Sequence, residues 1–265
     1  MKRLLRLALS IPLALLLYIL LAALGVASLV WNLIAMLLHP MLPADTGRTL
    51  GRAVIAHAYR IFWGAASLCG MMRIDSSCLD ALRNERGLIF VANHPTMLDA
   101  LLLVARLPRS ACIMKADLMR NVFLGAGARL ARYIRNDSAR TMVRLAVDDL
   151  RNGGQLVIFP EGTRTVKPPL DAFRPGVTLI AKLAQAPIQT VFIDTDSPYL
   201  AKGWPLWRVP PLPIVFRLRL GQRFAPSQDS DLLLMQIEQY FRHSMEQRAP
   251  DAQPACQTSR APTLS

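Results

Sequence analysis

The stretch IFVANHPTMLDALLL, residues 89–103, joins two apolar runs through a short polar interruption. The first run is short and stops at Asn-His-Pro, which is typical of a buried strand that ends in a turn. The second run carries Pro95 at its start, a position that helices favour, and predicts a helix over residues 95–107. The unit is therefore predicted to be a strand followed by a helix, with His94 between them and Asp99 in the second helical turn.

Strand-like and helix-like segments alternate from residue 73 to residue 248. Further strands are predicted over 111–116, 132–137, 155–163, 187–195 and 213–224. Further helices are predicted over 78–87, 121–132, 138–154, 174–186 and 230–248. This alternation predicts an α/β fold, in which a mixed, mostly parallel sheet is flanked by helices on both faces.

An uncharged apolar run of 32 residues, from Leu7 to Leu38, precedes this region. A membrane helix needs only about 20 such residues, so the run predicts an anchor that spans or deeply enters a bilayer. A helical hairpin inserted from one side stays open, because Pro12 and Gly25 could bend the run, and a buried core helix is a further alternative. The length disfavours a cleaved secretory signal, and the basic MKRLLR start favours a cytoplasmic N-terminus.

Three parts of the chain are predicted from these patterns. Residues 1–72 hold the anchor and a second helix over 48–72, which lies on the membrane or, equally, inside the main domain. Residues 73–248 form the α/β domain, and the polar tail 249–265 is predicted to be disordered. The Trp- and Pro-rich linker 197–213 is interpreted as a lid, a membrane-contacting loop or a surface connection.

The chain is basic, with 31 Lys and Arg residues against 18 Asp and Glu and a net charge of +13. Beside a membrane anchor this charge predicts an anionic bilayer as partner, because each Lys or Arg near such a surface contributes roughly 1 kcal/mol. Nucleic acid is disfavoured, since no zinc-finger spacing or RNP motif is present. The four cysteines form no CxxC, which indicates buried thiols in a reducing compartment and no disulfide framework or metal site.

His94 and Asp99 could meet at the end of the predicted strand. A His just before a helix can fold back over the first turn and contact an Asp side chain there. The carboxylate then holds one ring nitrogen protonated and leaves the other as a base, which can deprotonate a substrate hydroxyl directly. The alternative is a structural pair, in which His94 caps the helix and Asp99 satisfies it.

The stretch FPEGTR, residues 159–164, ends another predicted strand. Gly162 allows a tight turn with positive φ. Arg164 offers a planar fork that suits a phosphate, and Glu161 could hold that arginine or receive a substrate hydroxyl. An ordinary polar turn with a salt bridge is the alternative.

Lys115 and Arg135 each lie at the end of a strand-like run, beside a loop. Together with Arg164 they could place three cations around one anion. Arg120, Arg129 and Arg132 are interpreted as a solvated basic face.

The segments NHPTMLD, 115–135, FPEGTR and API, in this order over about residues 87–193, resemble the four blocks of the PlsC-type lysophosphatidic acid acyltransferases. These enzymes form a family of the glycerophospholipid acyltransferase superfamily. The resemblance implies a glycerol-3-phosphate acyltransferase-like fold and a membrane-bound O-acyltransferase without metal or cofactor. The fatty acyl group would move from acyl carrier protein or acyl-CoA to a lysophospholipid hydroxyl, with 1-acyl-glycerol-3-phosphate giving phosphatidic acid.

The same resemblance implies roles for individual residues. His94 would be the general base and Asp99 its orienting partner. The acceptor phosphate would be bound by Lys115, Arg135 and Arg164, while Glu161, Gly162 and Thr163 shape the acceptor site. Backbone N–H groups near the first block are the default expectation for the donors that stabilise the tetrahedral intermediate.

Two departures from the family pattern leave alternatives open. The fourth block here is Ala186-Pro187-Ile188-Gln189-Thr190-Val191, without the second Pro of the family's V-P-I-V-P-V. The second block ends in R-N-D, where many relatives have an acidic residue before the Arg. The chain could therefore acylate another acceptor, such as a lyso-ornithine or aryl polyene-type lipid, or could only bind anionic lipid without catalysis.

No HExxH, GxSxG or Walker motif is present, which disfavours a zinc protease, a serine hydrolase and an NTPase. The basic surface is expected to attract an acidic carrier protein and the bilayer. The predicted location is the inner (cytoplasmic) membrane, with the catalytic domain facing the cytoplasm.

Overall fold

The computed structural model describes residues 2–205 and 208–247 of the 265-residue chain, so the tail predicted to be disordered lies outside the described residues. The strands are β1 (Met72–Asp75), β2 (Leu88–Ala92), β3 (Ser110–Met114), β4 (Ile134–Arg135), β5 (Gln155–Ile158), β6 (Ile188–Thr195) and β7 (Ile214–Phe224). The α-helices are α1 (Lys2–Leu38), α2 (Ala44–Leu68), α3 (Asp99–Arg106), α4 (Gly125–Leu130), α5 (Ala139–Arg151), α6 (Gly176–Ala184) and α7 (Ser230–Glu246). Two 3₁₀ helices are η1 (Ser77–Leu82) and η2 (Ala116–Arg120).

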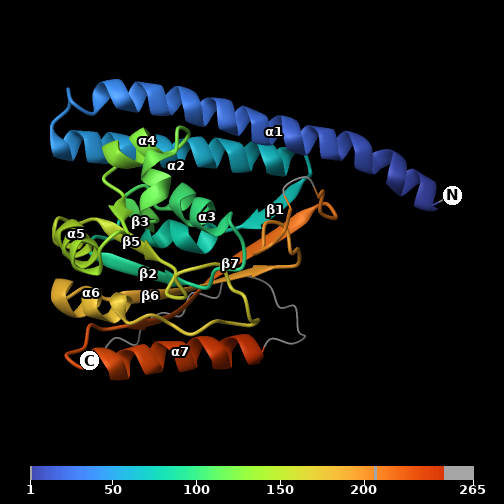
Figure 1. Ribbon diagram of the computed structural model, residues 1–265. Coiled ribbons are helices and arrows are strands. Elements are labelled where there is room, and N and C mark those ends of the chain that lie inside the picture. The colour runs from blue at the N-terminus through green and yellow to red at the C-terminus, as the bar shows by residue number, and fades with distance from the viewer. Residues whose placement is uncertain (1, 206–207, 248–265) are drawn as a thin grey trace.

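The strands form one sheet in the order β1-β7-β6-β2-β5-β3-β4 (Figure 1). Every neighbouring pair is parallel except β6 and β7, which are antiparallel. The predicted fold class, a mostly parallel mixed sheet between helices, is therefore confirmed. Because β2, β5 and β3 are adjacent and parallel, the loops that follow them gather at one edge of the sheet.

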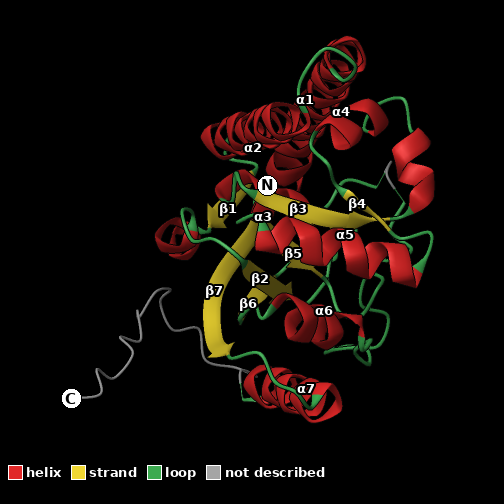
Figure 2. Cartoon of the chain, turned by 90° about the vertical axis from the view of Figure 1, so that its left-hand side faces the viewer, coloured by secondary structure: helices red, strands yellow, loops and turns green. Residues whose placement is uncertain are grey.

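Strand β2 shows how the sheet divides two apolar layers. All five of its residues are buried. Leu88, Phe90 and Ala92 face the cluster that includes α2 and α3, whereas Ile89 and Val91 face the cluster of α5, α6 and α7. Helices α1 and α7 lie at opposite ends of the molecule in Figures 1 and 2.

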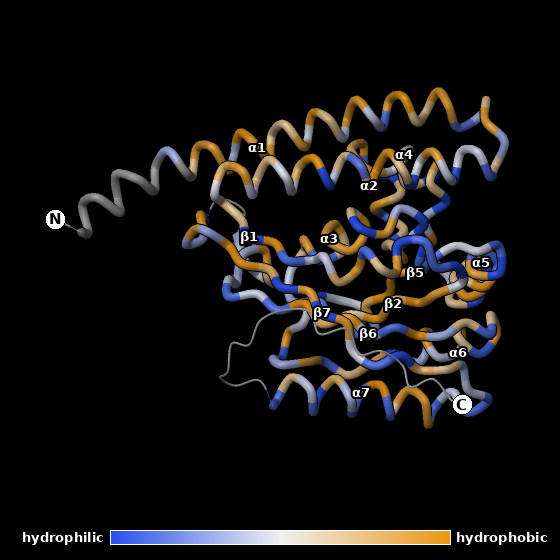
Figure 3. The backbone as a smooth tube through the Cα atoms, turned by 180° about the vertical axis from the view of Figure 1, so that it is seen from behind, coloured by the Kyte–Doolittle hydropathy of each residue, from blue (hydrophilic) through white to orange (hydrophobic). Residues whose placement is uncertain are grey.

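Helices α1 and α2 form an antiparallel hairpin above the sheet (Figure 1). Helix α2 lies between α1 and the domain, packing on α3, α4 and β1. It is thus both a partner of the anchor and a covering helix of the domain. Figure 3 shows the coloured part of α1 as mostly apolar, whereas α2 alternates between apolar and polar residues.

A buried ion pair fixes α2 to the far side of the domain. The Arg52 guanidinium lies 2.8 Å from Asp149 Oδ1 on α5, and both side chains are almost fully buried. Arg52 also donates to the backbone carbonyls of Ala131 and Arg109. The guanidinium is therefore well satisfied, and removing one partner would leave an uncompensated buried charge.

Several element boundaries differ from the sequence-based predictions. Helix α2 begins at Ala44 and not at residue 48, and the segment predicted as a helix over 78–87 is the shorter η1. Strand β1 was not predicted, because the second helix was expected to continue to residue 72, whereas α2 ends at Leu68 and Gly70 turns the chain with a φ of +71°. It pairs with β7 at the edge of the sheet.

Candidate active site

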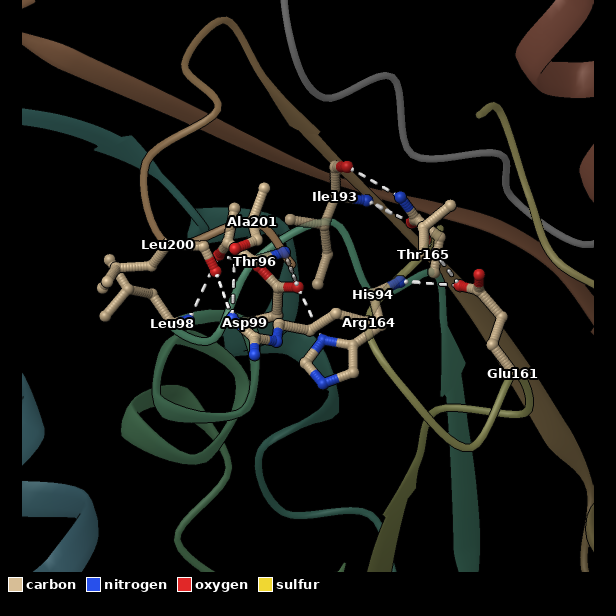
Figure 4. Close-up of polar contacts among 11 residues, drawn as sticks. His94, Thr96, Leu98, Asp99, Glu161, Arg164, Thr165, Ile193, Leu200 and Ala201 are labelled. Carbon is tan, nitrogen blue, oxygen red and sulfur yellow. Dashed lines mark hydrogen bonds and ion pairs between the residues drawn. The ribbon is translucent and has the colours of Figure 1, made fainter. Parts of the chain in front are cut away.

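His94 lies two residues after the end of β2, at the edge to which the parallel order also brings the loops that follow β3 and β5. Figure 4 shows Glu161 and Arg164, from the loop after β5, near His94. Asn93, the intervening residue, donates to the Ile193 carbonyl at 2.9 Å and accepts from the Ile193 N–H at 2.8 Å. This pair of bonds extends the β2–β6 ladder beyond its last paired residue, Ala92. Asn93 therefore fixes the point from which His94 leaves the sheet, a role that the sequence did not indicate.

His94 Nδ1 lies 2.8 Å from Asp99 Oδ2, so the structure forms the expected pair. The Asp99 carboxylate also accepts from the Thr96 N–H at 2.7 Å and from the Thr96 hydroxyl at 2.6 Å. It is fully buried, whereas the His94 side chain keeps 17% of its surface exposed. Asp99 is thus fixed inside the protein, whereas His94 remains accessible to a substrate.

The helix that carries Asp99 begins later than predicted. Helix α3 starts at Asp99 itself, and residues 95–98 form a turn, so the expected helical start at Pro95 is wrong. The physical reason is local: Thr96 bonds to the Asp99 carboxylate with both its N–H and its hydroxyl. Asp99 therefore occupies the first helical turn, close enough for His94 to reach it.

Glu161 holds the two loops of the site together. Its Oε1 accepts from the His94 N–H and from the Thr165 hydroxyl, each at 3.0 Å, and its Oε2 accepts from the Asp171 N–H at 3.1 Å. The Thr165 N–H donates to the His94 carbonyl at 2.8 Å. Glu161 is almost completely buried and fully engaged, so it acts by positioning and does not hold Arg164.

Burial raises the pKa of both carboxyl groups. Desolvation is the largest effect on the pKa of Asp99, and the hydrogen bonds from His94 and Thr96 oppose it. Desolvation also raises the pKa of Glu161, against the hydrogen bonds from Asp171, Thr165 and His94. The hydrogen bonds are what allow these carboxylates to exist in the charged form inside the fold.

The His94 ring stacks on Phe159, with 4.0 Å between ring centroids and 19° between planes. With Nδ1 facing Asp99, Nε2 lies on the other side of the ring and contacts none of the residues drawn in Figure 4. An imidazole fixed by a carboxylate and an aromatic ring, with its second nitrogen free, is the geometry of a general base.

Four backbone N–H groups of the first block already donate within the described part of the chain. Those of His94, Thr96 and Leu98 donate to the side chains of Glu161, Asp99 and Thr96. That of Met97 donates to the Leu200 carbonyl, and Pro95 has none. These four groups hold the turn, and the expectation that backbone donors near this block stabilise the tetrahedral intermediate stays a prediction.

Arg164 lies beside His94 at the end of the FPEGTR turn (Figure 4). Its Nη1 donates to the carbonyls of Leu200 and Ala201 in the linker after β6, at 2.9 and 3.2 Å. These bonds fix one end of the guanidinium and leave its other nitrogens for a ligand. The linker therefore works as a brace of the site, which the sequence left open.

Lys115 and Arg135 lie progressively farther from His94. Lys115 follows β3, two strands from β2, and Arg135 is in β4, three strands away and thus roughly 14 Å off at the usual ~4.8 Å strand spacing. Arg135 is 57% exposed and pairs with Asp137 at 3.1 Å. It also lines a pocket of ≈ 440 Å³ beside α2, α4 and α5. The structure does not bring Arg135 together with the His94–Asp99 pair.

Gly162 adopts a φ of +72°, as predicted for the tight turn, and Thr163 lies half-buried beside it. A Cβ at Gly162 would meet Arg174 Nε at 2.5 Å, so the guanidinium of Arg174 lies directly over the turn. Arg174 also donates its N–H to the Pro160 carbonyl at 2.9 Å. The sequence does not mark this cation, because it lies ten residues beyond FPEGTR, at the start of a predicted helix.

The departure in the fourth block has a structural explanation. Gln189 Nε2 donates to the Gly221 carbonyl and Thr190 Oγ1 to the Gln222 carbonyl, both in β7, where the β6–β7 register shifts. Thr190, which stands where the family has its second Pro, pairs with Val91, three residues before His94 and roughly 10 Å away along a strand. The substitution thus bonds β6 to β7 and lies away from the edge that carries His94.

The comparisons with known proteins concern the domain that carries this site. Residues 73–194 match the model of the family described as Acyltransferase, a range that contains His94, Asp99 and the whole FPEGTR turn. The acyltransferase resemblance predicted from four sequence blocks is confirmed for this range, and the chain contains an acyltransferase-type domain.

Among solved structures, the chain is similar to the crystal structure of the 1-acyl-sn-glycerophosphate acyltransferase PlsC from Thermotoga maritima. The TM-score is 0.65 at 20% identity, over 90% of this chain and 98% of that one. A curated Caenorhabditis elegans protein, provisionally named 1-acyl-sn-glycerol-3-phosphate acyltransferase acl-1, is 23% identical over 124 residues. These residues are 44% of this chain and span about half, 47%, of that relative.

Proposed function

We propose that the protein transfers a fatty acyl group from a thioester to the hydroxyl of a lysophospholipid. The proposed acceptor is 1-acyl-glycerol-3-phosphate and the product phosphatidic acid. The observation that carries this proposal is the His94–Asp99 pair at 2.8 Å, with Nε2 free beside the FPEGTR turn. Neither a protein nucleophile nor a covalent acyl-enzyme is required, because the acceptor supplies the attacking hydroxyl.

His94 alone can carry the proton through the proposed reaction. Nε2 takes the acceptor's hydroxyl proton as the oxygen forms a C–O bond to the thioester carbonyl carbon. The tetrahedral intermediate then collapses, its C–S bond breaks, and the thiolate takes the proton back from the imidazolium. Asp99 stabilises the imidazolium between these events and keeps the ring in the correct tautomer.

Arg164 and Arg174 are the proposed ligands of the acceptor phosphate. They stand on the 161–165 turn and over Gly162, next to the loop that His94 and Glu161 share. Two guanidiniums can bind a phosphate through several charge-assisted hydrogen bonds. Lys115 would complete the set from the adjacent strand, whereas Arg135 is left with a minor role.

Helix α1 is proposed to lie in the plane of one membrane leaflet and not to cross the bilayer. Residues 14–38 are long and apolar enough to span, but one face of the helix is partly buried where it packs on α4 and α2, with Leu17 and Ala35 fully buried. The opposite face exposes large apolar side chains: Leu15, Tyr18, Ile19, Val26, Leu29, Val30, Leu33, Ile34, Met36 and Leu37. A helix with one protein-bound face and one apolar outer face suits interfacial insertion.

The cytoplasmic membrane surface is the proposed location, because the N-terminal basic cluster and the net charge of +13 favour an anionic leaflet. The donor is proposed to be acyl carrier protein or acyl-CoA, both of which present a thioester on a negatively charged carrier. The sequence left other acceptor lipids open because the fourth block lacks the second Pro of the family pattern. With Gln189 and Thr190 bonded to β7, no described contact favours a lyso-ornithine or aryl polyene-type lipid.

The test is to incubate membranes containing the protein with labelled acyl-CoA or acyl carrier protein and a panel of lysolipids, and to identify the product by mass. Phosphatidic acid from 1-acyl-glycerol-3-phosphate is the expected product, with a dependence on His94. Acylation only of an acceptor without a phosphate monoester would contradict the proposed substrate but not the chemistry. Membrane binding without any acyl transfer would support a lipid-binding protein instead.

A further inference from the structure

Large apolar side chains are exposed on the segment that follows Lys115. This segment, residues 116–124, consists of η2 and the turn before α4. Leu118, Val122 and Phe123 are 38%, 62% and 44% exposed, respectively. Three such side chains within nine residues form an apolar surface that nothing in the described fold covers.

Two polar side chains of α1 hold this segment against the helix. Ser28 Oγ donates to the Phe123 carbonyl and Asn32 Nδ2 to the Val122 carbonyl, both at 2.6 Å. Asn32 Oδ1 also accepts the Gly127 N–H at 2.9 Å. Ser28 and Asn32 are one helical turn apart, so a single side of α1 fixes the segment. The exposed side chains at 122 and 123 therefore lie alongside the apolar helix.

Positive charge is concentrated in the stretch of sequence that contains these apolar residues. Between residues 115 and 132 the cations Lys115, Arg120, Arg129 and Arg132 face a single acid, Asp117. Arg120 is exposed between Leu118 and Val122. Apolar side chains interleaved with cations are the composition that partitions into the headgroup region of anionic bilayers.

We propose that residues 116–124 form a second membrane-contact element, which enters the surface of an anionic phospholipid bilayer beside α1. The inference rests on the proposed membrane attachment through α1 and extends it to the loop that carries Lys115. Because Lys115 directly precedes the segment, membrane contact holds its ammonium at the depth of lipid phosphates. The acceptor could then be bound by its phosphate without leaving the leaflet.

The double variant Val122→Asp/Phe123→Asp tests the proposal by flotation with phosphatidylcholine vesicles that contain phosphatidylglycerol. Partitioning is expected to weaken by about tenfold, because two charges must enter the interface and apolar area is lost. The uncharged Val122→Ser/Phe123→Ser variant should weaken it by about threefold through the lost apolar area alone. Val122 and Phe123 are both exposed, so neither variant should disturb the core. An unchanged melting temperature in detergent will show that the fold is kept.

The matched control is Leu232→Asp/Met235→Asp on α7, at the end of the molecule opposite α1 (Figure 1). These side chains are 45% and 56% exposed, so the control adds the same charge to a comparable apolar surface. Its partitioning should stay within about twofold of the wild type. Equal partitioning of the 122/123 variants, the control and the wild type would overturn the proposal.

Three further results bear on the proposal. If the 122/123 variants change the molecular mass in detergent and not the vesicle partitioning, the segment is an interface between copies and the proposal fails. With a water-soluble short-chain lysolipid the 122/123 variants should keep wild-type turnover, since the site is intact. A wild type that acylates no lysolipid would contradict the proposed function and leave the flotation result valid.

Discussion

The His94–Asp99 pair and the cations around it are held in opposite ways. The pair is bound from every protein side: Asp99 accepts three hydrogen bonds, and Glu161 and Thr165 fix the His94 backbone. Lys115 and Arg174 are exposed, and Arg164 is anchored through a single nitrogen. The proton-transfer group is thus pre-organised, whereas the anion-binding groups keep their freedom to adjust.

This contrast predicts two different effects of mutation. A change at the rigid pair should alter the rate of chemistry at unchanged substrate affinity, because its geometry is already set before the acceptor arrives. A change at the cations should alter mainly the affinity for the acceptor, because their full contacts form only with its phosphate. The variants below test this division.

Asp99→Asn should produce the largest loss, lowering kcat by about 100-fold or more at nearly unchanged KM. The amide keeps the shape but no longer stabilises the imidazolium and can impose the wrong tautomer. Steady-state rates with 1-acyl-glycerol-3-phosphate measure the effect, and Asp231→Asn on exposed α7 is the control. A loss confined to KM would show that the pair binds substrate and does not move protons.

Arg164→Ala should raise the acceptor KM by about tenfold, since a charge-assisted hydrogen bond contributes roughly 1.5–3 kcal/mol. Arg135→Ala should change it by less than about twofold, because Arg135 is solvent-exposed and paired with Asp137. Measuring KM for both variants in one assay ranks the two cations. The reverse order would place the phosphate near β4 and contradict the proposed site.

Arg174→Ala should raise the acceptor KM by a smaller factor, about fivefold, with kcat nearly unchanged. Arg174→Lys should recover part of this loss, because the charge remains while the planar fork is gone. Gly162→Ala should resemble Arg174→Ala, since the added Cβ displaces the guanidinium and strains a positive φ. An Arg174→Ala variant with the wild-type KM would remove this residue from the acceptor site.

Glu161→Gln should have the smallest effect on the reaction rate, and it should change how the stability of the protein depends on pH. Burial raises the folded-state pKa of Glu161 above its ordinary value of 4.5. The folded protein therefore binds more protons between these two pKa values, and the free energy of unfolding falls as the pH rises through that window. Melting temperatures in detergent across this pH range should decline less steeply for the variant than for the wild type. Parallel curves would contradict the raised pKa.

Much of the fold could be predicted because its patterns are local. The buried strand over 88–92, the Ser138 cap and the alternating burial of β7 all follow from neighbouring residues. Strand β1 could not be predicted, since its four residues acquire a partner only through β7, some 140 positions later. The start of α3 was misplaced because the Thr96–Asp99 bonds compete with the proline's preference for a helical start.

Only the site residues that belong to recognisable sequence motifs could be predicted. His94, Asp99 and Arg164 lie in distinctive blocks, and the structure brings them to one edge. Arg174 and Asn93 act through contacts that no spacing shows, over Gly162 and across to Ile193. Arg135 looked equivalent to Lys115 in sequence, and only the strand order places it one strand farther away.

Acyl transfer by His94→Ala is the most direct test of the account. Purified wild type, His94→Ala and the exposed α7 control His243→Ala should be compared in vesicles that contain 1-acyl-glycerol-3-phosphate and a labelled acyl thioester, with phosphatidic acid quantified by mass. The control should form product at the wild-type rate, and His94→Ala should lose roughly 1,000-fold in rate with vesicle binding unchanged. Product formation by His94→Ala at the wild-type rate would contradict it.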